Sequence, residues 1–124
     1  MKDKRPVNLD IGSMRLPITA WASITHRASG VFLFFAMVFL VWALDMSLRS
    51  AEGFATLQSA LAGPLAKLIL LAIVAGLIYH SLAGIRHIIM DFGIGESFEV
   101  GALSARIVIG LSVVLTLLAG VLIW

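Results

Sequence analysis

The chain has 124 residues, of which 60% are hydrophobic, 13% are charged and none is cysteine. A soluble domain of this size carries roughly 25% charged residues, so this chain has too few charges to cover a surface that faces water. Lipid is therefore its expected solvent. The absence of cysteine excludes disulfides, iron–sulfur ligation and thiolate zinc sites within the chain. A net charge of +2 is too small to indicate nucleic-acid binding, so we expect no nucleic-acid partner.

The first segment, residues 1–16, is polar and irregular and its basic residues are Lys2, Lys4, Arg5 and Arg15. Charges and Pro6 occupy its beginning, so no cleavable signal peptide is evident. Pro17 suits the first turn of a helix, and Trp21 stands where an interfacial aromatic belongs. We expect the protein to insert by its first span and to keep its N-terminus.

Three uncharged apolar stretches follow, at residues 28–44, 68–85 and 107–124. At about 1.5 Å per residue each stretch nearly crosses a hydrocarbon core of roughly 30 Å, and flanking turns complete it. The sequence therefore predicts an all-α integral membrane protein with three transmembrane helices, at about 22–48, 65–90 and 104–124. We expect these spans to form a single membrane domain over residues 1–124, with no soluble domain.

Two loops connect the spans. In the first loop, residues 49–63, Phe54, Leu57 and Leu61 recur at helical spacing and predict a short interfacial helix. In the second loop, residues 91–106, we expect the helix to be broken by Gly93, Gly95 and Gly101.

The positive-inside rule predicts the orientation. Most basic residues precede the first span or flank the second loop, whereas the first loop region has only Arg49 and Lys67. The N-terminus and the second loop should therefore face the cytoplasm, and the C-terminus the opposite side. This topology brings the polar residues 23–27 of the first span and 87–91 of the second to the same side of the membrane.

His80 lies a few residues past the middle of the second span, where a bare imidazole is costly. It is a histidine hydrogen-bonded across helices, a proton relay or a haem ligand. A relay is the weakest of these interpretations, because no chain of acids runs through the spans. We favour a haem ligand, because neutral imidazole suits iron and Gly76 and Gly84, one turn away on each side, leave room for a flat macrocycle.

His87 falls on nearly the same helix face as His80, roughly 10 Å further along the axis. That separation is too large for both histidines to ligate one iron, so a second axial ligand must come from elsewhere. The alternative for His87 and Arg86 is snorkelling to the interface or contact with lipid head groups.

A second polar cluster lies at the start of the first span, where Ser23, His26, Arg27 and Gly30 share one helix face. One interpretation is an arginine that sets topology beside an interfacial histidine. The other is that His26 and Arg27 meet the carboxylates of a haem, since arginine binds carboxylates bidentately, and that Ser23 donates to a quinone carbonyl. Asp91 either supplies protons to such a site or is simply solvated.

Two motifs carry a resemblance to a known family: Ser-Ile-x-His-Arg-x-Ser-Gly at residues 23–30 and His-x6-His-x3-Asp at residues 80–91. Together with residues 5–10 and 17–19, they resemble the cytochrome b subunit of bacterial succinate dehydrogenase (respiratory complex II). This subunit is the larger membrane anchor in the type of complex that has two anchor chains. The resemblance covers nearly the whole chain.

The resemblance implies a three-helix anchor in the bacterial inner membrane, with a cytoplasmic N-terminus and a periplasmic C-terminus. Such an anchor forms a bundle with a second membrane-anchor subunit, holds one haem b with it, and docks the flavoprotein and iron–sulfur subunits. Succinate is oxidised on the flavoprotein, and electrons pass through iron–sulfur clusters to ubiquinone. This chain itself does not carry the succinate site.

Residue by residue, the resemblance implies that His80 is one axial haem ligand and that the partner anchor supplies the other. It implies that His26 and Arg27 meet the haem propionates, and that Ser23 and Arg27 belong to the quinone site. The alternatives are a haem-free structural anchor and the anchor of a fumarate reductase, which has the same scaffold. A small transporter or proton channel would need more intramembrane acids or a broken helix.

Overall fold

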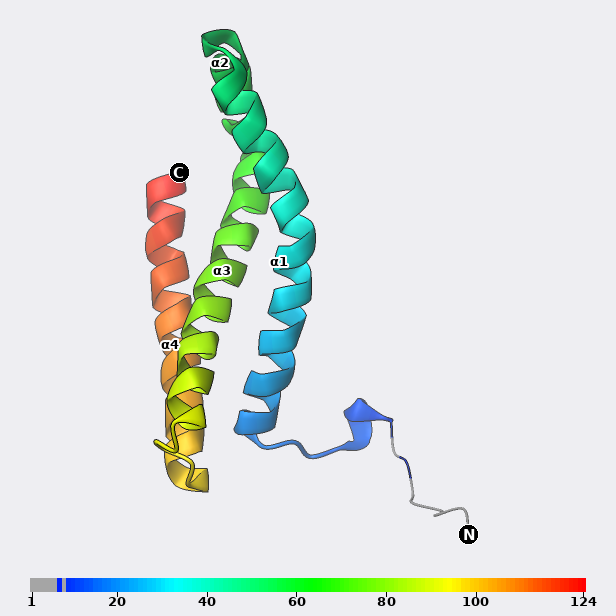
Figure 1. Cartoon of the computed structure of the whole chain (residues 1–124), viewed down its shortest axis with the longest axis vertical. Coiled ribbons are helices and arrows are strands. Elements are labelled where there is room, and N and C mark those ends of the chain that lie inside the picture. The colour runs from blue at the N-terminus through cyan, green and yellow to red at the C-terminus, as the bar shows by residue number, and fades with distance from the viewer. Residues whose placement is uncertain (1–6, 8) are drawn as a thin grey trace.

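The structure is a computed structural model that describes residue 7 and residues 9–124, and helices make up almost all of it (Figure 1). A short 3-10 turn, η1 (Ile11–Ser13), precedes four α-helices: α1 (Ile18–Arg49), α2 (Ala51–Leu61), α3 (Pro64–Asp91) and α4 (Phe98–Ile123). No strand occurs in this part of the chain, so the all-α prediction is confirmed. By length and composition, α1, α3 and α4 are able to cross a membrane, as expected for three spans.

The three long helices run side by side, with α3 between α1 and α4 (Figure 1). Because they alternate in direction, the first turns of α1 and α4 and the last turns of α3 lie at one end of the bundle, which we call the histidine end. The opposite end carries α2 and the C-terminus. The sequence prediction that residues 23–27 and 87–91 lie at the same end is therefore confirmed.

Local sequence signals set the ends of the helices. Pro17 is the N-cap of α1. Ser50 is extended (φ −164°) and accepts a hydrogen bond from the backbone nitrogen of Gly53 at 3.0 Å, which ends α1 and caps α2. The predicted helix in the first loop is thus present as α2. The second loop is shorter than predicted, because only Gly93 (φ 78°) and Gly95 (φ 76°) turn the chain.

Gly101 was expected to break the helix, and this expectation is wrong. It lies buried inside α4, where a side chain on it would meet Thr19 of α1 at 3.6 Å and Arg86 of α3 at 4.0 Å. Glycine at this position therefore serves close packing of three helices rather than a turn. The basic residues Lys2, Lys4 and Arg5, on which part of the predicted orientation rests, lie outside the described residues.

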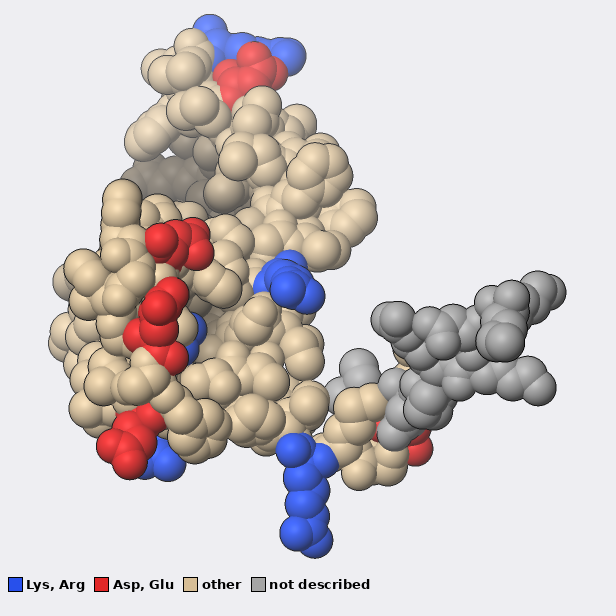
Figure 2. Space-filling view, turned by 60° about the horizontal axis from the view of Figure 1, so that its bottom comes forward, with Lys and Arg blue, Asp and Glu red and all other residues tan. Residues whose placement is uncertain are grey.

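The buried apolar side chains are few and mostly small: Ala22, Ala36, Ile73, Ala83 and Ala105. Small residues at helix contacts let helices approach closely, which is the usual packing mode in lipid. Most large apolar side chains are exposed instead, including Phe34 at 71% and Leu122 at 87%. Figure 2 shows that charged side chains are sparse on this face of the molecule and that most of the surface is uncharged. Such a surface suits lipid or neighbouring helices rather than water.

Candidate functional site

All three histidines of the chain meet where α1 crosses α3 at the histidine end. The ring of His26, on α1, stacks on that of His80, on α3, with centroids 4.4 Å apart and an interplanar angle of 21°. The same ring contacts that of His87, with centroids 5.3 Å apart and an interplanar angle of 36°. The three side chains are half-buried. His87 is therefore part of one histidine cluster with the other two, and its ring is not simply directed to the interface.

The two nitrogens of His80 have different surroundings. Nδ1 lies 2.9 Å from Oγ of Ser29 and 3.3 Å from the backbone oxygen of His26. Nε2 has no hydrogen-bond partner among the described residues. A histidine that is held through one nitrogen and free at the other has the arrangement of a metal-ligating imidazole.

His26 carries a buried atom without a partner. Its Nε2 is buried and makes no hydrogen bond within the described part of the chain. The atom faces Gly84 of α3, where an added Cβ would lie 3.5 Å away. Because buried polar atoms are paired in most proteins, an unpaired imidazole nitrogen beside a second imidazole marks a site that a further group can complete.

The glycines of α3 have a different role from the one expected. We predicted that Gly76 and Gly84 leave space for a flat macrocycle. The structure instead fills that space with side chains of α1: a Cβ at Gly76 would lie 2.9 Å from the ring of Phe32, and Gly84 faces His26. The reverse arrangement occurs at Gly30 of α1, where an added Cβ would lie 3.1 Å from Cε1 of His80 on α3. These glycines therefore let large side chains of one helix pack on the backbone of the other.

Ser23 and Arg27 lie one turn apart on α1 at the histidine end. Ser23 is half-buried and Arg27 is exposed. Neither side chain makes a hydrogen bond or an ion pair to any of the described residues. Their hydroxyl and guanidinium donors are therefore available to a ligand. Asp91 is exposed at the end of α3, in agreement with a solvated carboxylate.

The alternative that Arg86 snorkels to the interface or contacts lipid head groups does not fit the structure, because the residue is buried against α4. Its side chain is only 8% exposed and binds α4. Nε donates to Oγ of Ser104 at 2.9 Å, and Nη2 donates to the backbone oxygen of Gly101 at 3.0 Å. The Ser104 hydroxyl donates to the same oxygen at 3.0 Å, which closes the network.

Sequence reasoning missed the hydrogen bonds of Tyr79 and Ser29. The hydroxyl of Tyr79 bonds that of Thr25 and donates to the backbone oxygen of Ala22 at 3.2 Å, so it ties α3 to α1. Ser29 was noted only as part of a motif. Its spacing of three residues from His26 places it on the same helix face, which is the signal that would have pointed to it.

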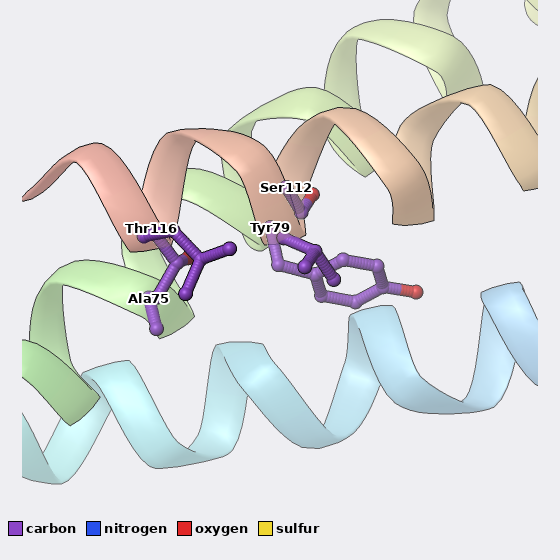
Figure 3. A pocket seen from close by; sticks show the side chains of 6 residues that line it. Ala75, Tyr79, Ser112 and Thr116 are labelled. Carbon is purple, nitrogen blue, oxygen red and sulfur yellow. The ribbon is translucent and has the colours of Figure 1, made fainter. Parts of the chain in front are cut away.

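A shallow groove of about 270 Å³ lies on α3 and α4 next to Tyr79 (Figure 3). Ser112 and Thr116 project into it from α4, and the Tyr79 hydroxyl points away from Thr116 and Ala75. The Ser112 hydroxyl donates a hydrogen bond to the backbone oxygen of Val108 at 2.7 Å. The histidine cluster does not line this groove, so the candidate site stays with the histidines.

Among the described residues, no three histidine or carboxylate side chains are arranged to hold a bare metal ion. The histidine cluster instead offers single imidazole nitrogens at the contact of two membrane helices. Three apolar helices, each long enough to cross a membrane, with a histidine cluster at one end define the chain as a membrane helical bundle.

Comparison with known proteins identifies the family. The profile of the family described as "Succinate dehydrogenase/Fumarate reductase transmembrane subunit" matches residues 1–119. The chain is 41% identical to the succinate dehydrogenase cytochrome b556 subunit of Coxiella burnetii, over 100% of both chains. It is 33% identical to the protein of that name from Paracoccus denitrificans and 32% identical to that from Rickettsia felis, in both cases over 94% of this chain and 90% of the relative.

The chain therefore belongs to the family of succinate dehydrogenase and fumarate reductase transmembrane subunits. It is a multi-pass membrane anchor of this type of oxidoreductase complex. The resemblance seen in the two sequence motifs is confirmed at the level of the family.

Proposed function

We propose that the chain is the cytochrome b anchor of a succinate:ubiquinone oxidoreductase in the bacterial inner membrane. It forms one membrane-anchor domain over residues 1–124 with spans at about 22–48, 65–90 and 104–124. Its N-terminus is cytoplasmic and its C-terminus periplasmic, in keeping with the distribution of basic residues. It pairs with a second membrane-anchor subunit and docks the iron–sulfur and flavoprotein subunits. The names of the relatives favour this assignment over a fumarate reductase.

The haem proposal rests on the difference between the two ring nitrogens of His80, of which only Nδ1 makes hydrogen bonds to the described residues. Since Nδ1 is bonded to Ser29 and His26, Nε2 of His80 would be the atom that holds the haem iron. A second anchor subunit would supply the other ligand, because the three histidines of this chain contact one another in one cluster. When bound, haem b supplies a one-electron redox group.

His26 and Arg27 hold the haem propionates in this proposal. Nε2 of His26 and the guanidinium of Arg27 have no hydrogen-bond partner among the described residues, and both residues lie in the early turns of α1, at the histidine end. A guanidinium binds a carboxylate through two parallel hydrogen bonds, and an imidazole N–H adds a third. The pairing also satisfies the buried nitrogen that the chain alone leaves without a partner.

Ser23 and Arg27 bind ubiquinone. Reduction of a quinone needs hydrogen-bond donors at its oxygens and protons from nearby water. The hydroxyl of Ser23 donates to one quinone carbonyl, and the guanidinium of Arg27 orients the head group. Because Arg27 is exposed and Ser23 half-buried, the pair spans the boundary between water and the membrane helices.

The haem assignment is tested by measuring haem per flavin in the purified complex from His80→Ala and His87→Ala strains. We expect His80→Ala to lose most of its haem and His87→Ala to keep most of it. Only in His80 do hydrogen bonds of Nδ1 orient the ring and leave Nε2 for the iron. The reverse order would contradict the assignment. A wild-type complex without haem would instead support the haem-free structural anchor.

A further inference from the structure

Ser29 links the two histidines that the proposed haem site uses. Its hydroxyl lies 2.6 Å from the backbone oxygen of His26 and 2.9 Å from Nδ1 of His80. A backbone oxygen is only an acceptor, so the Ser29 proton points to His26. The lone pairs of the Ser29 oxygen then face His80, and Nδ1 must carry the proton of that contact.

This proton arrangement fixes the tautomer of His80. With the proton on Nδ1, Nε2 carries the lone pair that a metal requires. A hydrogen bond from the second ring nitrogen also raises the basicity of the coordinating one. Because the Ser29 hydroxyl is itself a donor to His26, it is polarised and becomes a better acceptor for Nδ1.

The surroundings of the His80 ring support a positioning role. Gly30, the residue after Ser29, lies so close that an added Cβ would be 3.1 Å from Cε1 of His80. The His26 ring stacks on the His80 ring at 4.4 Å. Backbone, stacking ring and hydroxyl, all from one turn of α1, therefore hold this imidazole.

We infer that Ser29 is the positioning residue of the haem ligand: its hydroxyl accepts the Nδ1 proton of His80, keeps Nε2 unprotonated and sets how strongly that nitrogen donates to iron. This inference rests on the proposed function of His80. Ser29 touches neither iron nor quinone, and acts through the imidazole alone.

A matched control exists on the same helix. Ser47 donates to the backbone oxygen of Leu44 at 2.7 Å, with the same spacing of three residues as Ser29 to His26. It is also half-buried on α1. Ser47 contacts no histidine, so Ser47→Ala removes an equivalent intrahelical bond without changing the ligand.

The experiment is a redox titration and a haem-per-flavin measurement on the intact purified complex from Ser29→Ala, Ser29→Thr, Ser47→Ala and wild type. Loss of a bond to a ligating histidine weakens metal affinity by about 10–100-fold. We expect the low end of that range for Ser29→Ala, because the His26 oxygen, 3.3 Å from Nδ1, remains as a second acceptor. The haem midpoint potential should rise, because a less basic imidazole stabilises ferric iron less.

Ser29→Thr keeps the hydroxyl and should restore the wild-type potential, and Ser47→Ala should leave it unchanged. The inference is overturned when Ser29→Ala has wild-type haem content and potential, or when Ser47→Ala shifts the potential equally. The proposed function fails separately, when His80→Ala keeps its haem. Loss of haem in His80→Ala with an unaltered Ser29→Ala complex overturns only the role of Ser29.

Discussion

The two packed sides of α3 treat buried polar groups differently. Against α4, the guanidinium of Arg86, the hydroxyl of Ser104 and the backbone oxygen of Gly101 form a closed network. Against α1, Nε2 of His26 is buried without a partner and Nε2 of His80 also lacks one among the described residues. At the first interface the polar side chains bond one another and the backbone, whereas at the second two ring nitrogens have no hydrogen-bond partner among the described residues.

The difference assigns separate tasks to the two interfaces. Polar residues within membrane helices are costly, so they persist where they hold helices together or take part in function. The closed network between α3 and α4 fits the first reason, and the open cluster between α1 and α3 fits the second. Changes at the first interface should therefore reduce assembly, and changes at the second should alter cofactor and quinone chemistry in an assembled complex.

The largest effect on assembly is expected for Arg86→Met. The substitution removes two hydrogen bonds from a charged, buried donor, worth about 3 kcal/mol together. We expect a lower yield of complex and a lower melting temperature, with normal haem per flavin in the complex that remains. Arg106→Met is the control, because Arg106 lies exposed on α4. Equal losses in both variants would show that charge near the membrane edge matters and that the network does not.

A smaller effect, confined to one activity, is expected for Ser23→Ala and Arg27→Ala. Each substitution removes one donor from the proposed quinone site, at about 1.5 kcal/mol or roughly a tenfold loss of quinone reduction. Succinate oxidation with a soluble dye should survive, because in the proposed complex succinate is oxidised on the flavoprotein subunit. Both rates are measured on the same membranes, beside Ser47→Ala and Arg49→Ala at the other end of α1. A parallel fall of both activities would indicate failed assembly and contradict the site.

Much of the fold followed from composition and periodicity. Three uncharged stretches sufficed to predict α1, α3 and α4, and Phe54, Leu57 and Leu61 predicted α2. Antiparallel spans necessarily bring residues 23–27 and 87–91 to one end. The extent of the second loop was not predictable in this way, because Gly101 looks like a helix breaker until Arg86 and Thr19 are seen to pack on it.

The candidate site was predictable as a set of residues but not as a network. Helical spacing placed His26 and His80 on their helix faces, yet it carries no information on how α1 and α3 pack against each other. The contacts of Ser29 with His80 and of Arg86 with Ser104 depend on that packing. Arg86 was misinterpreted because an arginine beside the second loop looks interfacial until α4 is placed over it.

The most direct test of the account is a redox titration of the haem in the purified complex from His80→Met, beside His87→Met and wild type. Replacing a histidine ligand by methionine raises the potential of a haem iron. If Nε2 of His80 ligates the iron, the midpoint potential and the reduced-minus-oxidised spectrum change in His80→Met and stay as in wild type in His87→Met. A wild-type potential and spectrum in His80→Met would contradict the assignment of His80 and leave the histidine cluster as helix packing.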